Sequence, residues 1–201
     1  TSPIVMVANP GLGAKTLKDY LASAKAQPGS LTYASGGTGA ITQLLGELVK
    51  ITAGINVREV PYKSIGAEMP DLLAGHVGIA YLAPSVIAQH VKSGKLIGLA
   101  VAGPRRVSII PDVPTMTEAG LPGVEGLGWN GLFAPAGTPA AIIERLRDEV
   151  AKAMASPQIR DEAIGFGQDV GGESPAEFGA FVRAEIAKWG KVIKDAGIKV
   201  E

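Results

Sequence analysis

Short apolar runs alternate with amphipathic segments over about the first hundred residues of the chain. The runs are bounded by glycine, proline or polar residues, which is typical of buried strands. We predict strands over 4–8, 31–34, 57–60, 77–82 and 96–102. Between the runs, apolar residues recur at helical spacing, and we predict helices that begin near residues 16, 41, 69 and 85. The first of these helices is expected to open with a capping box of Thr16 and Asp19, and the second to end at Gly54. Strands that alternate with helices predict βαβ crossovers and a mainly parallel sheet.

The remainder of the chain carries stronger helix signals. Residues 104–128 are rich in proline and glycine and show little periodicity, so we expect a linker or a long surface connection there. A strand is predicted over 129–134. Thr138 is the expected N-cap of the next helix, because a proline follows it at the first helical position. A capping box at Ser174 predicts a long helix that stops before Gly197.

Composition excludes several classes of function. The 201 residues include 19 Lys and Arg, 19 Asp and Glu, two His and no Cys. Such a balanced charge disfavours a nucleic-acid partner, because phosphate binding needs a basic surplus. Without Cys there are no thiol nucleophiles and no Cys-based zinc sites, and two histidines are too few for a His-rich metal centre. No apolar run approaches the ~18 residues of a membrane span.

The strongest local signal is a glycine-rich segment between the strand at 31–34 and the helix that follows it. Glycine allows a ligand to approach the backbone, and the first N–H groups of a helix attract an anion. Serine and threonine hydroxyls add donors and acceptors. We predict that this segment binds a carboxylate or a phosphate, and a simple βα turn is the alternative. Its residues are Ser35, Gly36, Gly37, Thr38, Gly39 and Ala40.

The same segment can be compared with two nucleotide-binding motifs. A Walker-type loop needs a lysine after its last glycine, and here the next lysine is Lys50. The dinucleotide fingerprint G-x-G-x-x-G/A fits Gly37 and Gly39, but Thr42 stands at its third position. Glu59 lies where a ribose-binding acid would stand. A nicotinamide-dinucleotide-binding oxidoreductase domain that uses the Gly37-x-Gly39 turn therefore stays open as the alternative function.

No catalytic constellation accompanies this segment. Neither His76 nor His90 has an acidic partner in a recognisable pattern, and the acidic residues are dispersed along helices. A binding protein therefore fits better than an enzyme. Tyr62 and Tyr81 each stand at the end of a predicted strand, where the ligands of open α/β sheets gather. Both tyrosines are therefore predicted to line a cleft.

Ordered sequence blocks run through nearly the whole chain. They are LTYASGGTG at 31–39, VPYK at 60–63, GKL at 94–96, PDVPT at 111–115, EAGLPG at 118–123, GLFAPAGTP at 131–139 and AKW at 187–189. In this order the blocks resemble those of the Bug-type (TctC-like) substrate-binding proteins, which serve bacterial tripartite tricarboxylate transporters.

The resemblance implies an α/β fold of the periplasmic-binding-protein-like (type II) class, with two lobes of parallel-rich sheets flanked by helices. Residues 1–8 would form a crossover strand, 9–125 the second lobe with the ligand loop at 35–40, and 126–201 the C-terminal part of the first lobe. The family's usual N-terminal portion has no counterpart in this sequence. We therefore expect an incomplete first lobe whose apolar surface favours self-association.

The function implied by the resemblance is that of a periplasmic receptor. Such a receptor closes on a di- or tricarboxylate or another small organic acid and delivers it to the membrane subunits of the transporter. In the family, ordered waters, backbone N–H groups and small hydroxyls hold the carboxylate, so no arginine clamp is expected. This interpretation includes no metal, cofactor or nucleic acid.

Overall fold

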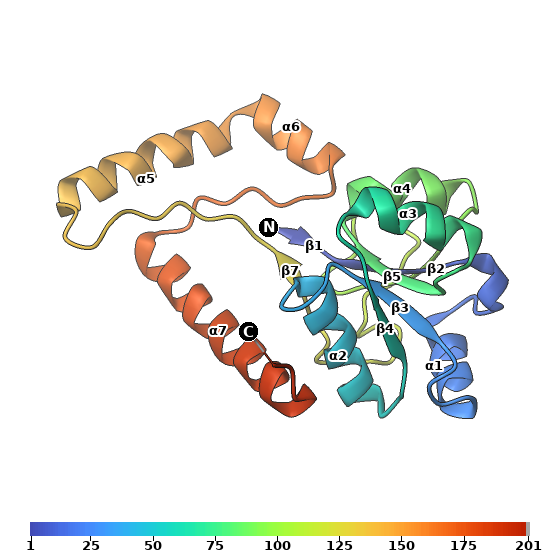
Figure 1. The fold of residues 1–201 in the computed structure, drawn as a ribbon. Coiled ribbons are helices and arrows are strands. Elements are labelled where there is room, and N and C mark those ends of the chain that lie inside the picture. Colours follow the sequence, from blue (N-terminus) through green and yellow to red (C-terminus); the bar gives the residue numbers. More distant parts are fainter. Residues whose placement is uncertain (200–201) are drawn as a thin grey trace.

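Five strands form a mixed sheet at the centre of the protein, whose computed structural model describes residues 1–199 (Figure 1). The strand order is β4-β3-β5-β2-β6. β3 runs parallel to β4 and β5, whereas β2 runs antiparallel to β5 and β6. The mainly parallel sheet is thus confirmed for four strands, and only β2 runs the other way. The strands are β2 (Val5–Ala8), β3 (Thr32–Ser35), β4 (Arg58–Pro61), β5 (Ile79–Leu82) and β6 (Ile97–Val101).

Helices cover both faces of this sheet. Two of them, α1 (Leu17–Ala26) and α2 (Ile41–Ala53), contribute to the hydrophobic cluster on one face. Two more helices, α3 (Ile65–Ala74) and α4 (Pro84–Lys92), contribute to the hydrophobic cluster on the opposite face. Successive residues of β2 alternate between the clusters, because neighbouring side chains of a strand point to opposite faces. β2, within the segment predicted as a crossover strand, therefore contributes to both sides of a three-layer α/β/α core.

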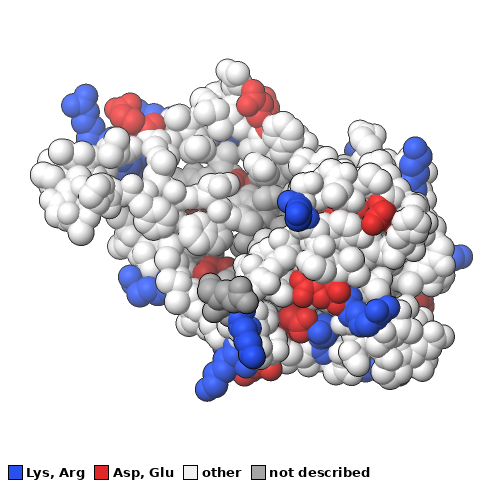
Figure 2. Space-filling model, in the orientation of Figure 1, with Lys and Arg blue, Asp and Glu red and all other residues white. Residues whose placement is uncertain are grey.

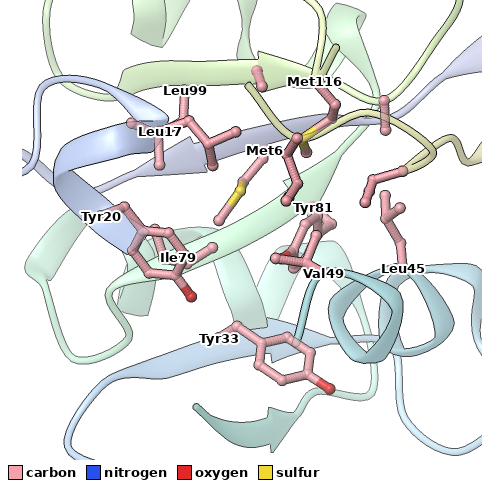
Figure 3. Packing of buried hydrophobic residues seen from close by; sticks show 14 of the residues in the cluster. Met6, Leu17, Tyr20, Tyr33, Leu45, Val49, Ile79, Tyr81, Leu99 and Met116 are labelled. Carbon is pink, nitrogen blue, oxygen red and sulfur yellow. The ribbon is translucent and has the colours of Figure 1, made fainter. Parts of the chain in front are cut away.

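Three tyrosines fill the cluster between the sheet and the pair α1 and α2 (Figure 3). Tyr20, Tyr33 and Tyr81 are each 1% exposed, and the rings of Tyr33 and Tyr81 meet edge to face with centroids 5.9 Å apart. α2 approaches these rings closely, since a Cβ atom on Gly46 would lie 2.7 Å from Cζ of Tyr33. This close packing fixes α2, and with it the turn that precedes α2, against β3.

Local signals account for the ends of several helices. The predicted capping box at Thr16 is present, because the Thr16 hydroxyl accepts from the Asp19 N–H and the Asp19 carboxylate accepts from the Thr16 N–H. α2 stops at Gly54, whose φ of 62° is left-handed and therefore suits glycine. The capping box at Ser174 is also present, and it opens α7 (Pro175–Ala196).

The prediction of a strand over 129–134 is wrong, because these residues form no strand. The chain instead forms the shorter strand β7 (Leu127–Gly128), which pairs antiparallel with β1 (Ser2–Pro3) and ends before residue 129. A strand needs a neighbour for its backbone N–H and C=O groups. Within residues 1–199 no strand pairs with 129–134, so the apolar alternation in that segment has no sheet to join.

The helices after this segment also differ in part from the prediction. The N-cap of α5 (Ala140–Ala155) is Pro139 and not the predicted Thr138. The hydroxyl of Thr138 does not cap the helix and donates instead to a carbonyl oxygen in the preceding turn. A further helix, α6 (Pro157–Gly165), follows it and was not predicted.

The C-terminal helices bury little of their apolar surface. α7 packs along α2, and an aromatic group joins Trp129 to Phe178 and Phe181 of α7 at centroid distances of 5.7 and 5.6 Å. No residue of α5 or α6 is buried. Leu132 and Phe133 are 78% and 71% exposed. On the face shown in Figure 2, acidic and basic side chains are interspersed rather than gathered into one patch.

Four strands end at the same edge of the sheet, because β3, β4, β5 and β6 share one direction. The short pair of β1 and β7 lies at this edge too, since β1 leads directly into β2 and the Gly126 N–H bonds the Ala102 carbonyl oxygen just beyond β6. The chain therefore leaves the sheet for the C-terminal helices at the edge where the connecting turns gather.

Candidate functional site

The glycine-rich segment 35–40 is the turn from β3 into α2, at the edge of the sheet where four strands end. Gly37 and Gly39 have φ angles of 89° and 79°, in a region that residues with a Cβ atom disfavour. α2 begins with Ala40 as its N-cap, and no side chain caps it. The turn therefore has the backbone shape that the sequence predicts, and it precedes a helix whose first N–H groups lack a side-chain cap.

Three glycine N–H groups of the turn bond to side chains of the protein itself. Their acceptors are the Thr42 hydroxyl for Gly36 (2.8 Å), the Ser35 hydroxyl for Gly37 (3.0 Å) and the Gln43 amide oxygen for Gly39 (2.8 Å). The glycines thus shape the turn, but their N–H groups are occupied and do not form the anion contacts that the sequence suggests.

The unoccupied donors of the turn lie at Thr38 and in the first turn of α2. Within residues 1–199, the N–H groups of Thr38, Ile41, Thr42 and Gln43 have no acceptor, and the first helical bond of α2 is made by the N–H of Leu44. Thr38 is exposed, and its hydroxyl has no hydrogen-bond partner among the described residues 1–199. Four N–H groups and one hydroxyl at the start of a helix can donate hydrogen bonds to a carboxylate, and the helix dipole adds partial positive charge there.

A carboxylate from the neighbouring strand β4 lies behind the turn. Glu59 accepts a hydrogen bond from the Ser35 hydroxyl with Oε1 and another from Gln43 Nε2 with Oε2, the latter at 2.9 Å. Gln43 is a buried polar residue on the apolar face of α2, which is the signal that could have placed it here from the sequence. The sequence analysis did not single out Gln43.

This arrangement argues against the alternative of a dinucleotide site. That alternative needs Glu59 to contact a ribose. In the structure both carboxylate oxygens of Glu59 are engaged by side chains at the turn. The acid predicted to bind a cofactor is instead part of the scaffold of the turn.

Two predicted contact residues are buried. Ser35 is 0% exposed, and its hydroxyl is shared between Glu59 and the Gly37 N–H. Tyr81 is 1% exposed and packs against Tyr33 in the core (Figure 3). The Tyr81 ring points from β5 into the hydrophobic core, so Tyr81 does not line a cleft as predicted. The Ser35 hydroxyl stabilises the turn by its buried hydrogen bonds. Neither side chain is available to a solute in this conformation.

Tyr62 follows β4 and lies partly exposed near the same edge. Its N–H bonds the Ser35 carbonyl oxygen at 2.8 Å, which ties the two turns together. Its hydroxyl donates to Asp71 Oδ2 at 2.9 Å, and partial burial together with this bond raises the pKa of Tyr62 to about 12. A hydrogen bond between Asp71 and His76, and then the bond from Tyr62, lower the pKa of Asp71. Tyr62 thus stays neutral beside the predicted loop.

Glu68, in the first turn of α3, is an acidic residue that the fold buries. Its side chain is 4% exposed, and its Oε1 has no partner within residues 1–199. Burial raises the pKa of Glu68 to about 7. It is not part of the candidate site, and we expect its burial to make the stability of the fold depend on pH.

Surface hollows lie elsewhere on the molecule. One of about 320 Å³ is bounded by α5, α6 and the segment 170–173, and one of about 290 Å³ lies beside Asn9 and Gly75. In residues 1–199 no group of three or more His, Asp or Glu side chains could hold a metal ion. In the same range, no helix is long and apolar enough to cross a membrane.

One known family matches nearly the whole chain. The model of the tripartite tricarboxylate transporter family receptor, TctC, matches residues 1–198. This chain belongs to the TctC family. Protein BugT of Bordetella pertussis is 31% identical over 199 residues, which cover 99% of this chain and 61% of BugT. A UPF0065 protein of Agrobacterium vitis is 32% identical over 200 residues, or 97% of this chain and 57% of that protein.

Solved structures of the family have the same fold. R. palustris Rpa4515 with adipate is 31% identical with a TM-score of 0.86, and the match covers 98% of this chain and 66% of that one. MatC from Rhodopseudomonas palustris with bound malate is 27% identical with a TM-score of 0.81, over 96% and 66% of the two chains. The TctC-family chain described here therefore spans about 60% of the length of the curated relatives named above.

Proposed function

We propose that this TctC-family protein is a periplasmic receptor that binds a small organic acid for a tripartite tricarboxylate transporter. The observation that carries the proposal is the set of N–H groups without an acceptor at Thr38 and in the first turn of α2, which no side chain caps, together with the exposed Thr38 residue. The protein acts by binding and not by catalysis, and its partners besides the acid are the membrane subunits of the transporter.

The position of the turn supports this function. It lies at the edge of the sheet where β7 leads toward the C-terminal helices. We infer that residues 126–201 belong to the first lobe and residues 9–125 form the second. A solute at Thr38 would thus lie between the lobes, and closure of one lobe on the other would bury its carboxylate. The solved relatives named with adipate and malate support a di-acid as the class of solute.

Isothermal titration calorimetry of the 201-residue chain against adipate, malate and other di- and tricarboxylates tests the proposal. Saturable heat with one or more of these acids is expected. If a chain shown to be folded by circular dichroism releases no heat with any acid of the panel, the proposed function fails for this chain.

Replacement of Thr38 tests the site itself. Thr38→Val removes a hydroxyl that would donate to a carboxylate, and a hydrogen bond to a charged group contributes about 1.5 kcal/mol or more, which is roughly tenfold in Kd. Thr52→Val, at an exposed position near the far end of α2, is the matched control and should leave Kd unchanged. Equal affinities of the Thr38 variant and the parent chain would remove the Thr38 hydroxyl from the site.

A further inference from the structure

We propose that Glu59 is a positioning residue for the solute site. Glu59 holds the turn 35–40 in the shape that leaves the Thr38 N–H free to bind the ligand. The inference rests on the proposed function and adds to it a residue of β4 that does not itself touch the solute.

Each oxygen atom of the Glu59 carboxylate begins a hydrogen-bonded chain that ends on a glycine of the turn. Oε1 accepts from the Ser35 hydroxyl, whose oxygen accepts from the Gly37 N–H at 3.0 Å. Oε2 accepts from Gln43 Nε2 at 2.9 Å, and Gln43 Oε1 accepts from the Gly39 N–H at 2.8 Å. Both end points are the glycines with positive φ, so the two chains fix the parts of the turn whose backbone is least constrained by side chains.

The direction of these chains follows from the chemistry of a carboxylate. An ionised carboxylate can only accept hydrogen bonds, so the Ser35 hydroxyl hydrogen and the Gln43 NH₂ group must face Glu59. The oxygen atoms of both side chains are then left for the glycine N–H groups. Without Glu59, the Gln43 amide could turn over and set its NH₂ group against the Gly39 N–H, donor against donor. Glu59 therefore orients both partners of the turn.

The negative charge of Glu59 is expected to weaken the binding of an acidic solute. Its effect on binding can therefore be separated from its support of the turn. A negative charge behind an anion site repels the ligand, so removal of the charge by itself should tighten binding. Glutamine at position 59 could still accept from Gln43 and donate to the Ser35 oxygen, whereas alanine could do neither. Glu59→Gln and Glu59→Ala thus remove the same charge, but only the second removes the support of the turn.

Amide hydrogen exchange followed by NMR tests the support without a ligand. Glu59→Ala should speed exchange at both Gly37 and Gly39 at least tenfold relative to the amides of β2. Ser35→Ala should do so at Gly37 alone, and Glu59→Gln at neither. The control is Glu47→Ala, because Glu47 lies on α2 but bonds Tyr33 and Lys50 instead of the turn. Unchanged exchange at both glycines in Glu59→Ala, or a uniform rise throughout the sheet, would overturn the positioning role.

Titration with adipate and malate then tests the consequence for binding. Glu59→Ala should weaken the Kd of whichever acid binds the parent chain about tenfold, whereas Glu59→Gln should bind it at least as tightly as the parent. If both variants tighten binding, Glu59 acts by its charge alone and the proposal is wrong. If the parent chain binds neither acid, it is the proposed function that loses support, and the exchange rates still decide whether Glu59 holds the turn.

Discussion

Glu68 places an acidic group in the interior of the protein, where its charged form is poorly solvated. The side chain lies in the first turn of α3 with 4% of its surface exposed, and its Oε1 has no hydrogen-bond partner within residues 1–199. Burial is the cause that raises the pKa of this carboxyl from 4.5 to about 7. In the unfolded chain the same group regains water and its ordinary pKa. The free energy of unfolding must therefore depend on pH through Glu68.

The sign and size of this dependence follow from the two pKa values. Below pH 4.5 Glu68 is protonated in both states and carries no penalty. Between that pH and about 7 the unfolded chain releases the proton while the folded chain retains it, so stability falls by about 1.4 kcal/mol per pH unit. Above about pH 7 the loss is complete, at roughly 3 kcal/mol. Glu68→Gln has no proton to release and should lack this decline.

Urea unfolding followed by far-UV circular dichroism measures the effect at about pH 5 and about pH 8. The parent chain should lose roughly 3 kcal/mol more than Glu68→Gln between these conditions. Comparing the two chains cancels the other titrating groups, and Glu125→Gln, at an exposed position, should retain the parental decline. Equal losses in the parent and Glu68→Gln would refute the argument, because they would show that the carboxyl is solvated in the folded protein.

Three further predictions concern core packing, helix propensity and self-association. Gly46→Ala would place a Cβ atom 2.7 and 2.9 Å from Cζ and Cδ2 of the buried Tyr33 ring, so we expect a net loss of about 1–2 kcal/mol in urea unfolding despite the better helix propensity. Gly190→Ala on α7 meets no atom within 4 Å and should instead stabilise the protein by about 0.5–1 kcal/mol. We expect self-association through the exposed surface of residues 129–199, which should make sedimentation depend on concentration. Phe133→Ser should weaken this dependence, and a monomer at all concentrations would contradict it.

The sequence predicts the elements whose signals are local. The capping boxes at Thr16 and Ser174 and the terminal Gly54 need only neighbouring residues, and all three are confirmed. The prediction of a strand over 129–134 failed because a strand needs a distant partner, which alternation of apolar residues does not supply. The antiparallel direction of β2 was also not predicted, because strand direction depends on contacts with β5 and β6, far along the chain.

The candidate site shows the same division. Its position in the turn after β3 follows from the glycines and the helix behind them, which are local features. The donors that remain free could not be predicted, because they depend on which N–H groups the side chains of Thr42 and Gln43 occupy. Tyr81 was misplaced because the end of a strand gives no information about the face to which its side chain points.

The role of Glu59 depends on the register between two strands. β4 pairs in parallel with β3 so that Glu59 stands opposite Tyr33, whose ring lies on the α2 face of the sheet. Side chains alternate along a strand, so Ser35 shares that face with Tyr33, and Glu59 reaches both Ser35 and Gln43. A slip of one residue would turn Glu59 to the opposite face and leave the turn without its acceptor. A glycine turn followed by an acid fits both a dinucleotide site and a self-supporting turn, and the register separates the two.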